Sequence, residues 1–583
     1  MLRSPAHPRR RRGRHGRDRS PTDPFEGRFP PGSPGVGSGN RSPGGDDVTP
    51  APPAELIAAV LDTTAAAHGE RTAVVHGDRR LTWAETAEQS RTLARALLAQ
   101  GVRRGDSIAL WLPNHPEWLL LWLAAVRIGA AVVPVNTRYT PDEAAYVLEQ
   151  SQARLLVVEA DFLGLDHPAA FATICPDWDG AHSERLPDLH GLVVVGGPPV
   201  PGALAFADLV ASAGQVDEET LAAATRAVQP ADPVAVVYTS GTTGRPKGVV
   251  HTHAAVAMMR AVGAVMGYGP DDVVLGHLPL FHVSGLFSSF LPTVLTGGAY
   301  VALDTWDAGV ALRLLEDEGV TVLSGIPTHF IDLLHHPDLP GTDTTRLRTG
   351  WIGGSTLPTE VLAGARDTLG MQALLPVYGM TELTSTTTLG RPDDPVESLL
   401  AGKGLPLGGY DVVLVDPATR EPVPVGTEGE IVVRGYVVMA GYHRDPDATA
   451  AVLDDEGWFR TGDLGVFDER GYLAITGRLS DMLIVGGFNV HPADVEHVLT
   501  AHPDVVQAHV VARPDARLGE VPVAFVECRA GSTTTPADLL AHCRDRLAGF
   551  KVPREIRFPD SWPTTPTGKV QRFRLRELAA QSA

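Results

Sequence analysis

The sequence predicts an α/β protein with a large N-terminal domain of layered α/β sheets, a small β subdomain, and a small α+β C-terminal domain. Three observations lead to this prediction. From Ala54 onward, helical patterns alternate with short apolar runs, which is typical of helices that cover largely parallel sheets. Near residue 405 the pattern changes to short strands separated by turn residues. The chain has 583 residues, more than one hydrophobic core usually serves.

Residues 1–50 form a segment of their own. The run MLRSPAHPRRRRGRHGRDRS is rich in arginine, and GRFPPGSPGVGSGNRSPGG is rich in proline, glycine and serine. Neither composition can bury a core, so we expect a disordered tail. No apolar segment follows RRRR, as a twin-arginine signal requires, and the Pro/Gly content opposes an amphipathic transit helix. Our hypothesis is a dispensable tail or a mis-assigned start; N-terminal sequencing that finds residue 1 in the native protein would exclude the second.

Helices and strands are expected in alternation from Ala54. Amphipathic patterns predict helices over residues 54–68 and 83–100. Strands are predicted at SIALWL, AAVVPV, RLLVVE, LVVVGG, VVLGHL, YVAL, TVLSGI and GWIGG. The most apolar run, residues 119–135, contains Arg127 and Pro134 and is short for a membrane span. We therefore expect a buried helix followed by a strand, and no transmembrane segment.

The pattern changes again towards the C-terminus. Residues 410–435 read as short strands joined by the turns DPATRE and PVGTEGE, which predicts a small antiparallel β subdomain. After GRLSD, the last roughly 100 residues alternate strand and helix patterns in the manner of a compact α+β domain. We therefore divide the chain into a tail (residues 1–50), a large domain (51–478) and a small domain (479–583).

The composition narrows the functional classes. The net charge is −20 although the first 50 residues carry ten arginines against five acidic residues, so the rest is strongly acidic. An acidic body argues against nucleic-acid binding. Hydrophobic and charged contents of 43% and 20% are typical of a soluble globular enzyme. Cys175, Cys528 and Cys543 have no metal-ligand or disulfide spacing and fit a reducing cytosol, which predicts a cytoplasmic protein.

The stretch Tyr238–Gly248 reads YTSGTTGRPKG and follows the apolar run VAVV. Glycines allow a backbone to approach a ligand closely, and hydroxyl and N–H groups are what phosphate oxygens accept from. A helical pattern follows in VVHTHAAVAMMRAVGAV, so we expect strand, loop and helix, an arrangement that binds phosphate. It is not a Walker A loop, because Gly248 follows the lysine where Ser or Thr is required.

Six further motifs follow this loop. They are GHLPLFHVSG (276–285), IGGSTLP (352–358), YGMTE (378–382), FRTGDLG (459–465), GRLSDMLIVGGFNVHPADVE (477–496) and PTGKVQR (566–572). Their order and spacing resemble the adenylate-forming (AMP-binding) superfamily, which includes acyl-CoA synthetases, peptide-synthetase adenylation domains and luciferases. The resemblance covers roughly residues 54–577, and several independent motifs in family order are far more specific than one.

The resemblance implies how ATP is held at the phosphate end. The loop that wraps the β- and γ-phosphates would be Thr239, Ser240, Gly241, Thr242, Thr243 and Gly244. Lys247 would add positive charge there. Glu382 would be the Mg²⁺ ligand, assisted by the Thr239 hydroxyl, since Mg²⁺ needs few protein carboxylates when phosphate oxygens and water complete its shell.

The resemblance also assigns the base, ribose and reacting groups. Around the base and the acyl pocket, the wall would be Gly353, Gly354 and Ser355, and the YGMTE motif would supply Tyr378, Gly379 and Thr381. Tyr378 would stack on adenine and Thr381 would contact the α-phosphate. Asp463 would accept hydrogen bonds from both ribose hydroxyls, with Arg478 reaching the ribose or phosphate. Lys569 would be the catalytic lysine, whose ammonium neutralises the charge that develops when a carboxylate attacks the α-phosphate.

On the acyl and CoA side, His282 would lie near the acyl pocket and gate it, although a satisfied core histidine remains an equal alternative. Gly486 and Gly487 would line a pantetheine tunnel, or else form a tight turn. Lys569 lies near the C-terminus, so the resemblance implies a mobile small domain that closes over the large one and then rotates. Ser480 would be the hinge, at a position where many relatives carry Asp or Lys.

The resemblance implies a two-step reaction. A carboxylic acid and Mg·ATP give an acyl adenylate and pyrophosphate, and CoA then displaces AMP to give a thioester. The segments GGFNVHPADVE and KVPREIRFPDSWPTTPTGK look most like bacterial fatty-acid and ring-carboxylate CoA ligases. Two alternatives stay open: a stand-alone ligase that loads an acyl carrier protein, and a non-catalytic nucleotide- or acyl-binding sensor. A homodimer is suggested by the family alone.

Overall fold

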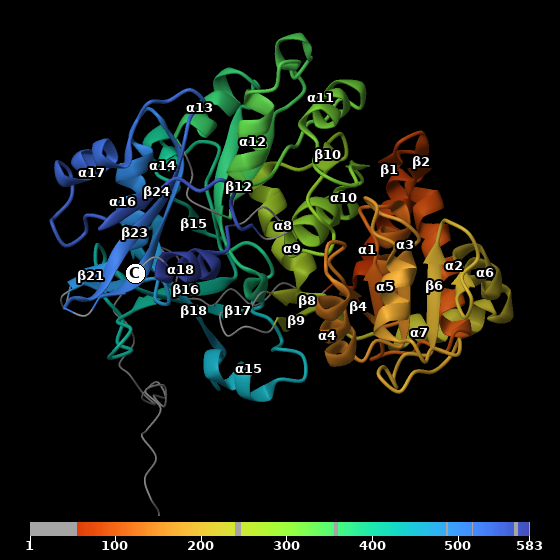
Figure 1. Cartoon of the computed structure of the whole chain (residues 1–583). Coiled ribbons are helices and arrows are strands. Elements are labelled where there is room, and N and C mark those ends of the chain that lie inside the picture. Colours follow the sequence, from red (N-terminus) through yellow and green to blue (C-terminus); the bar gives the residue numbers. More distant parts are fainter. Residues whose placement is uncertain are drawn as a thin grey trace, which may run out of the picture. The chain divides into compact units, whose positions relative to one another are not determined.

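The computed structural model describes residues 55–239, 246–354, 359–485, 488–515, 517–564 and 570–581, with backbone only for residues 359–360 and 488–489. These residues form layered α/β sheets, as predicted (Figure 1). Within them, no helix has both the length and the hydropathy that crossing a bilayer demands. All three cysteines are free thiols; Cys175 and Cys543 are buried and Cys528 is half-buried.

A seven-stranded sheet organises the N-terminal part. Its order is β7-β6-β5-β3-β4-β8-β9, and every neighbouring pair is parallel except β8 and β9. The strands are β3 (Ser107–Trp111), β4 (Ala131–Pro134), β5 (Leu155–Glu159), β6 (Gly191–Val195), β7 (Leu204–Ala205), β8 (Pro233–Thr239) and β9 (Lys247–Thr252). Strand β3 is buried throughout, as expected of a parallel strand with helices on both faces.

Helices precede and connect these strands. They are α1 (Ile57–His68), α2 (Trp83–Ala99), α3 (Pro116–Arg127), α4 (Pro141–Ser151), α5 (His167–Ile174), α6 (Phe206–Ser212), η1 (Ala213–Gln215) and α7 (Glu218–Ala227). A capping box starts α2, where the Thr82 hydroxyl accepts from the Glu85 N–H and the Glu85 carboxylate accepts from the Thr82 N–H. The apolar run at 119–135 forms buried α3 and then β4, so that prediction is confirmed.

A second layer contains two four-stranded sheets, ordered β10-β11-β1-β2 and β12-β13-β14-β15. The strands are β1 (Thr72–His76), β2 (Arg79–Thr82), β10 (Val273–Gly276), β11 (Ala299–Ala302), β12 (Thr349–Gly353), β13 (Ala373–Tyr378), β14 (Thr388–Leu389) and β15 (Leu405–Pro406). The expected strand TVLSGI is instead an irregular segment, in which Val322 makes isolated bridges to Val274 of β10 and Thr349 of β12. It therefore joins the two sheets.

Helical elements surround this second layer. They are α8 (Ala255–Met266), α9 (Val283–Gly285), η2 (Leu286–Phe290), α10 (Leu291–Thr296), α11 (Ala308–Asp317), α12 (Pro327–Leu334), η3 (Leu339–Gly341), α13 (Thr359–Asp367), η4 (Thr381–Leu383) and α14 (Val396–Leu400). The η2 segment is a π-helical turn, an element that is frequently found at functional sites.

The β subdomain predicted around residues 410–435 is confirmed as a four-stranded antiparallel sheet. It contains β16 (Tyr410–Val415), β17 (Gly429–Gly435), β18 (Trp458–Phe467) and β19 (Leu473–Arg478), with α15 (Pro446–Val452) between β17 and β18. The C-terminal part is a separate α+β layer. It contains β20 (Leu483–Val485), β21 (Phe488–Val490), α16 (Pro492–Thr500), β22 (Val505–Asp515), β23 (Gly519–Cys528), α17 (Pro536–Arg544), β24 (Glu555–Arg557) and α18 (Arg572–Ala580).

One prediction about the phosphate loop was wrong. The chain from Lys247 does not enter a helix but forms β9, which pairs antiparallel with β8 from Thr239↔Lys247 to Pro233↔Thr252. Helix α8 begins only at Ala255. The β-branched Val249 and Val250 extend the sheet by one strand, so the loop joins two strands and does not lie at a helix N-terminus.

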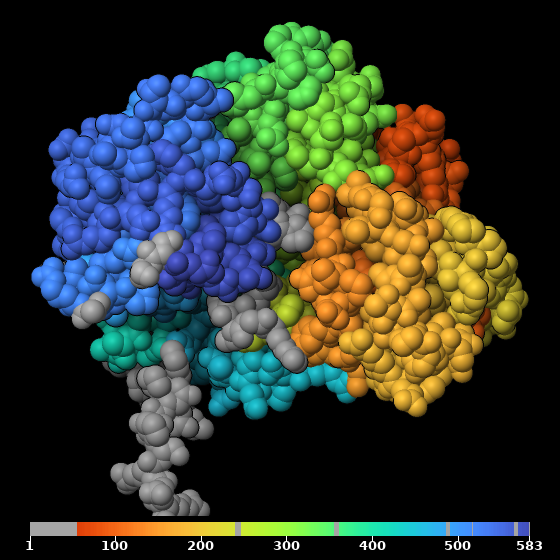
Figure 2. Space-filling view, viewed as in Figure 1, coloured from red at the N-terminus to blue at the C-terminus, as the bar shows by residue number. Residues whose placement is uncertain are grey.

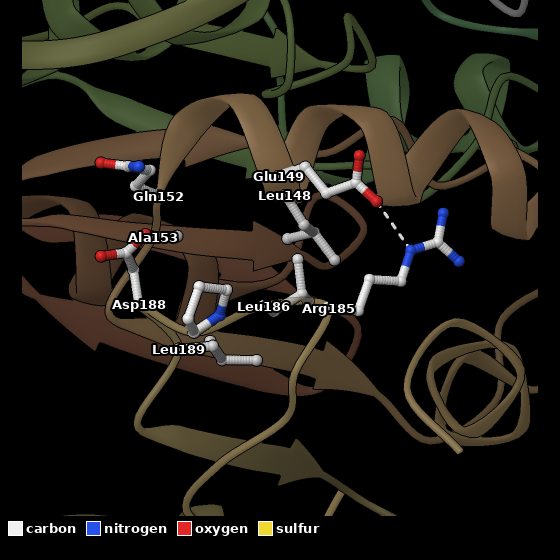
Figure 3. Close-up of a pocket in the computed structure, with 9 residues that line it drawn as sticks. Leu148, Glu149, Gln152, Ala153, Arg185, Leu186, Asp188 and Leu189 are labelled. Atoms are coloured by element: carbon white, nitrogen blue, oxygen red, sulfur yellow. Dashed lines mark hydrogen bonds and ion pairs between the residues drawn. The ribbon is translucent and has the colours of Figure 1, made fainter. Parts of the chain in front are cut away.

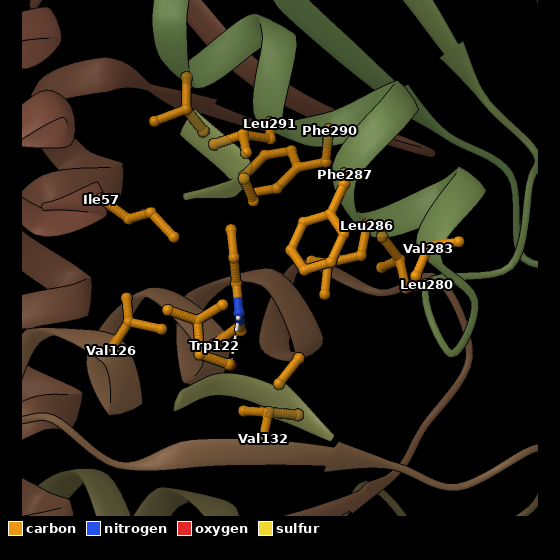
Figure 4. Close-up of a cluster of buried hydrophobic side chains, with 14 of the residues drawn as sticks. Ile57, Trp122, Val126, Val132, Leu280, Val283, Leu286, Phe287, Phe290 and Leu291 are labelled. Carbon is orange, nitrogen blue, oxygen red and sulfur yellow. Dashed lines mark hydrogen bonds between the residues drawn. The ribbon is translucent and has the colours of Figure 1, made fainter. Parts of the chain in front are cut away.

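The largest core cluster packs α1, α3, β8 and η2 around Trp122 (Figure 4). The Trp122 side chain is fully buried, its ring lies 6.0 Å from that of Phe290 in an edge-to-face arrangement, and its Nε1 donates to the Val234 carbonyl at 3.1 Å. The indole therefore ties α3 to strand β8 by packing and by one hydrogen bond.

Trp122→Ala is expected to lower the free energy of unfolding by about 3–5 kcal/mol, because it leaves a large cavity. Trp122→Phe should cost about 1–3 kcal/mol, since it leaves the buried Val234 carbonyl without its donor. Thermal and chemical denaturation measure both effects. The matched control is Trp178→Phe, because the Trp178 Nε1 bond to the Gly202 carbonyl lies near solvent and water can replace it. Equal effects at both positions would contradict the assignment of Trp122 to the core.

Candidate active site

One cluster of predicted residues lies where β13, β18 and β19 meet. The Tyr378 hydroxyl donates to Asp463 Oδ2 at 2.9 Å, and Arg478 Nε donates to Asp463 Oδ1 at 2.5 Å. The Asp463 side chain is 5% exposed. Asp463 and Arg478 stand opposite each other in the β18–β19 register, so the sheet itself sets this pair.

The electrostatics of this cluster follow from burial and one charge. The Asp463 carboxylate, more than any other group, raises the pKa of Arg478. Burial, and then the Asp463 carboxylate, raise the pKa of Tyr378 well above its usual range. Tyr378 therefore stays a neutral hydrogen-bond donor. The remaining lone pairs of the carboxylate can accept two further donors, such as a pair of neighbouring sugar hydroxyls.

A second cluster forms around Glu382 in η4. Glu382 is 8% exposed, and its Oε1 accepts from the Tyr442 hydroxyl at 3.0 Å. The Lys247 ammonium lies 4.9 Å from the centre of the Tyr442 ring, within the range of a cation–π contact. Lys247 stands opposite Thr239 in the β8–β9 register. One tyrosine thus connects the acidic residue of YGMTE to the β8–β9 hairpin, which carries the predicted phosphate loop.

The backbone reinforces this connection through a seam, by which we mean β9 and residues 439–443. The Val250 N–H donates to the Gly441 carbonyl at 3.0 Å, and the Ala440 N–H donates to the Val250 carbonyl at 3.0 Å. On the other side, the Met439 N–H donates to the Glu382 carbonyl at 2.8 Å. The seam therefore holds β9 and η4 at a fixed separation.

Three predicted glycines are required by the local packing. A Cβ on Gly353 would lie 2.6 Å from the Val377 carbonyl of the neighbouring strand, and one on Gly379 would lie 1.8 Å from the Ser385 carbonyl. Gly354 has φ +86°, which favours glycine. These glycines let β12, β13 and the turn after η4 pack closely, whatever they also contribute to a ligand.

His282 caps the short helix α9, where its Nδ1 accepts from the Ser284 N–H at 3.2 Å. His251 of β9 is fully enclosed, and burial, followed by the positive charge that His282 can carry, lowers its pKa to about 3. His251 is therefore neutral, and its Nδ1 lies 3.5 Å from the Thr384 hydroxyl. The structure thus places His282 near a second, buried histidine outside the predicted site residues.

Ser480 lies in the turn that follows β19. Its carbonyl accepts from Arg576 Nη2 at 3.1 Å, and the neighbouring Asp481 accepts from the same guanidinium at 2.6 Å. Arg576 belongs to α18, so the turn predicted to be the hinge is tied to the last helix. Several other predicted residues lie outside the described part of the chain. They are Ser240, Gly241, Thr242, Thr243, Gly244, Ser355, Gly486, Gly487 and Lys569.

A hollow of about 140 Å³ lies elsewhere, between α4 and the loop 185–189 (Figure 3). Arg185 Nε pairs with Glu149 Oε1 at 2.6 Å at one end of it. Among the described residues, no predicted site residue lines this hollow, so it is separate from the two clusters above.

Sequence reasoning brought out Tyr378, Glu382 and Asp463 but missed Tyr442. Tyr442 belongs to no motif used in the prediction. The signal that could have found it is the segment VVMAGYHRD between the β subdomain strands, where a tyrosine follows a glycine and precedes a cap residue. Its role emerges only from contacts with two residues far away in the chain.

Comparison with known proteins places these clusters in context. The family model of the AMP-binding enzyme matches residues 61–443, and that of the AMP-binding enzyme C-terminal domain matches residues 494–569. The chain is 40% identical to the 3-[(3aS,4S,7aS)-7a-methyl-1,5-dioxo-octahydro-1H-inden-4-yl]propanoyl:CoA ligase of Rhodococcus jostii, over 89% of this chain and 97% of that protein.

Two further relatives are also CoA ligases by name. The mitochondrial medium-chain acyl-CoA ligase ACSF2 of Mus musculus is 34% identical, over 89% of this chain and 87% of that protein. The crystal structure of the anthranilate CoA ligase AuaEII in complex with anthranoyl-AMP superimposes with a TM-score of 0.80 at 27% identity, covering 91% of this chain and 98% of that chain.

Proposed function

The chain belongs to the AMP-binding enzyme family and is an ATP-dependent, AMP-forming acid–CoA ligase, and we propose that the Asp463 and Glu382 clusters perform its first half-reaction. The proposal rests on two sets of contacts. One runs from Arg478 through Asp463 to Tyr378, and the other runs from Glu382, four residues after Tyr378 in the chain, through Tyr442 to Lys247. Carboxylate acceptors and a cation thus come from η4 and from strands of three sheets.

In the first step, an oxygen of the substrate carboxylate bonds to the α-phosphorus of ATP. The bond from that phosphorus to the bridging oxygen breaks, and the electron pair leaves with pyrophosphate. In the second step, the sulfur of CoA bonds to the acyl carbonyl carbon, the thiol proton is lost, and the bond to the AMP oxygen breaks. The products are a thioester and AMP.

Nucleotide positioning follows from the residues of each cluster. Asp463 accepts from the ribose hydroxyls, while Arg478 and Tyr378 keep the carboxylate in place. Lys247, in contact with the Tyr442 face, presents its charge to the phosphates beside Thr239, and Thr381 contacts the α-phosphate. The adenine stacks on Tyr378, next to the close-packed Gly353, Gly354 and Gly379. Lys569 and the loop residues 240–244 complete the set of residues proposed to bind ATP.

The chemistry of Glu382 fits Mg²⁺. One nearly buried carboxylate is an oxygen donor, and Mg²⁺ in nucleotide sites uses one or two carboxylates together with phosphate oxygens. The Thr239 hydroxyl, also an oxygen donor, is the second ligand we propose. When bound, Mg²⁺ supplies positive charge to the phosphate oxygens. The contribution of the chain is to hold Glu382 through the Tyr442 hydroxyl and the Met439 N–H.

The substrate class we propose is a fatty or ring carboxylic acid, with CoA as the acceptor. The names of two relatives support it, since one acts on a bicyclic propanoyl group and another is a medium-chain acyl-CoA ligase. Free cysteines support a cytoplasmic location. We also propose the domain boundary after Arg478 and the hinge at Ser480. The suggested homodimer stays a prediction.

Mass spectrometry of the products formed from a panel of acids with Mg·ATP and CoA tests this proposal. The panel contains short, medium, long, aromatic and steroid-derived carboxylic acids. Acyl-CoA and AMP from the medium-chain or ring acids is the expected result and identifies the substrate class. Acyl adenylate that accumulates without acyl-CoA would instead favour a carrier protein as the acceptor. Absence of any product across the panel would contradict the substrate class.

Tyr442→Phe is expected to lower kcat/KM for acyl-adenylate formation by roughly 10–150-fold, because a hydrogen bond to a charged group contributes about 1.5–3 kcal/mol. Rates of pyrophosphate release, measured at increasing ATP concentration with saturating acid, give this kcat/KM. The matched control is Tyr436→Phe, whose hydroxyl donates to the Gly408 carbonyl at 3.1 Å away from Glu382. If both variants retain wild-type rates, Tyr442 does not position Glu382.

A further inference from the structure

Two histidines share one carboxylate outside the residues assigned above. His76 Nε2 lies 2.7 Å from Asp304 Oδ1, and His115 Nε2 lies 3.4 Å from Asp304 Oδ2. The centres of the two imidazole rings are 4.7 Å apart. Each histidine thus faces a different oxygen of the same aspartate.

The fold brings these residues together at the carboxyl ends of parallel strands. His76 ends β1, and Asp304 follows β11, its parallel neighbour. Figure 2 shows the β1–β2 segment, in red, beside the green segment that contains α11. His115 follows β3 and caps α3, and Glu159 ends β5, which is parallel to β3. Ligand sites in α/β sheets form preferentially at this edge.

The residue before His115 fixes the geometry. The Asn114 amide is 3% exposed, and its Nδ2 donates to the carbonyls of Gly276, Leu278 and Leu303 at 3.0–3.2 Å. Its Oδ1 accepts from the Leu280 N–H at 2.9 Å. Because Leu303 directly precedes Asp304, this amide holds the His115 loop against the Asp304 loop. The two side chains are therefore positioned by buried backbone contacts.

His115 also has a carboxylate behind it. Its Nδ1 lies 3.2 Å from Glu159 Oε2, while its Nε2 faces Asp304. The Nδ1–Oε2 separation is an ion-pair distance, and the buried Glu159 Oε2 forms no hydrogen bond within the described part of the chain, so it can accept from Nδ1. In metal-binding histidines one ring nitrogen usually donates to a carboxylate while the other binds the ion. The Glu159 side chain is 12% exposed, so this partner is well shielded from solvent.

We propose that His76, His115 and Asp304 bind a divalent transition-metal ion of the zinc class, with Glu159 orienting His115. The three ligand atoms all lie within 4.8 Å of one another. Donors around a tetrahedral ion with bonds of about 2.0–2.2 Å stand about 3.3 Å apart, so small side-chain rotations accommodate the ion. Water fills the open position.

The donor set decides the class of metal. Two imidazole nitrogens and one carboxylate suit Zn²⁺, Co²⁺ or Ni²⁺, whereas Mg²⁺ and Ca²⁺ prefer oxygen donors alone. The site is thus chemically distinct from the oxygen donors at Glu382. The bound ion would link the end of β1 to the start of α3, and a ligand that binds only the folded chain stabilises it.

Titration of the full chain, stripped with chelator, with Co²⁺ and with Zn²⁺ tests this proposal. We expect the cluster to be saturated by one metal ion per chain. Bound Co²⁺ should show the visible absorption of a tetrahedral site, and Zn²⁺ should raise the Tm. His76→Gln and Asp304→Asn should abolish the Co²⁺ absorption and the Zn²⁺-dependent rise in Tm. Glu159→Gln should weaken binding by roughly 10–100-fold while leaving the Co²⁺ absorption in place at saturation.

The matched control is His336→Gln, which removes a histidine from another His–Asp pair, 3.8 Å from Asp338. It should bind like wild type. Acyl-CoA formation serves as a check that every variant is folded. A wild-type chain that shows no tetrahedral Co²⁺ absorption would overturn the proposal whatever the variants do. Equal metal binding by wild type, His76→Gln and Asp304→Asn would do the same, and would leave the cluster as an ion-pair network.

Discussion

Replacing Lys569 by alanine should reduce acyl-adenylate formation by at least roughly 10²–10³-fold, while thioester formation from preformed acyl adenylate stays within about threefold of wild type. The first half-reaction brings a carboxylate against a triphosphate, and a positioned ammonium neutralises the negative charge that develops between them. The second half-reaction has no such encounter, because the adenylate is already formed and the attacking group is a thiol.

The two half-reactions are measured separately, by pyrophosphate exchange and by release of AMP from synthetic acyl adenylate with CoA. Lys551→Ala is the matched control, since it removes a lysine from the same C-terminal part, where Lys551 Nζ pairs with Asp494. That variant should keep both activities. Equal loss of both half-reactions in Lys569→Ala would contradict the prediction that the small domain presents Lys569 for adenylation and a different face for thioester formation.

The second large effect is expected for Asp463→Asn, which should raise the KM for ATP by at least about tenfold and change kcat less. The amide keeps the shape but loses the charge and replaces an acceptor oxygen with a donor, so it cannot accept from both ribose hydroxyls and Arg478. The Arg478 guanidinium also loses its ion pair at 2.5 Å.

Asp411→Asn is the matched control. Asp411 and Arg434 form the same kind of cross-strand pair on β16 and β17 of the same sheet, at 2.7 Å, and neither belongs to the predicted site. Its KM for ATP should stay at the wild-type value. Substituting 2′-deoxy-ATP sharpens the test, because wild type should lose affinity for it and Asp463→Asn should not distinguish it from ATP. An unchanged KM in Asp463→Asn would refute the ribose assignment.

Most of the architecture could be predicted because the hydrophobic patterns are strong. The alternating runs from Ala54 gave the layered sheets, and the turns around residue 420 gave the antiparallel subdomain. Strand β9 was missed because its six residues run without a turn signal into a helical pattern. Its identity depends on pairing with β8 and on the seam, and neither partner is visible in a local window.

Candidate site residues could be proposed from the sequence only where they form motifs. Asp463 and Tyr378 stand in separate motifs, yet their hydrogen bond could not be foreseen, because it depends on how β13 meets β18. Tyr442 was missed because a single tyrosine carries no pattern. The His76, His115 and Asp304 cluster was equally hidden, since strand ends from two sheets bring its members together.

The seam between β9 and residues 439–443 has a consequence for laboratory recombination. Its hydrogen bonds join main-chain atoms, so they do not depend on which parent supplies each side. Among the seam contacts, those of Tyr442 with Lys247 and Glu382 involve side chains, so these three residues must be inherited together. A segment between Thr252 and Gly353 that comes from a homologous parent therefore leaves the seam contacts in place, provided that it keeps the packing of Phe290 on Trp122.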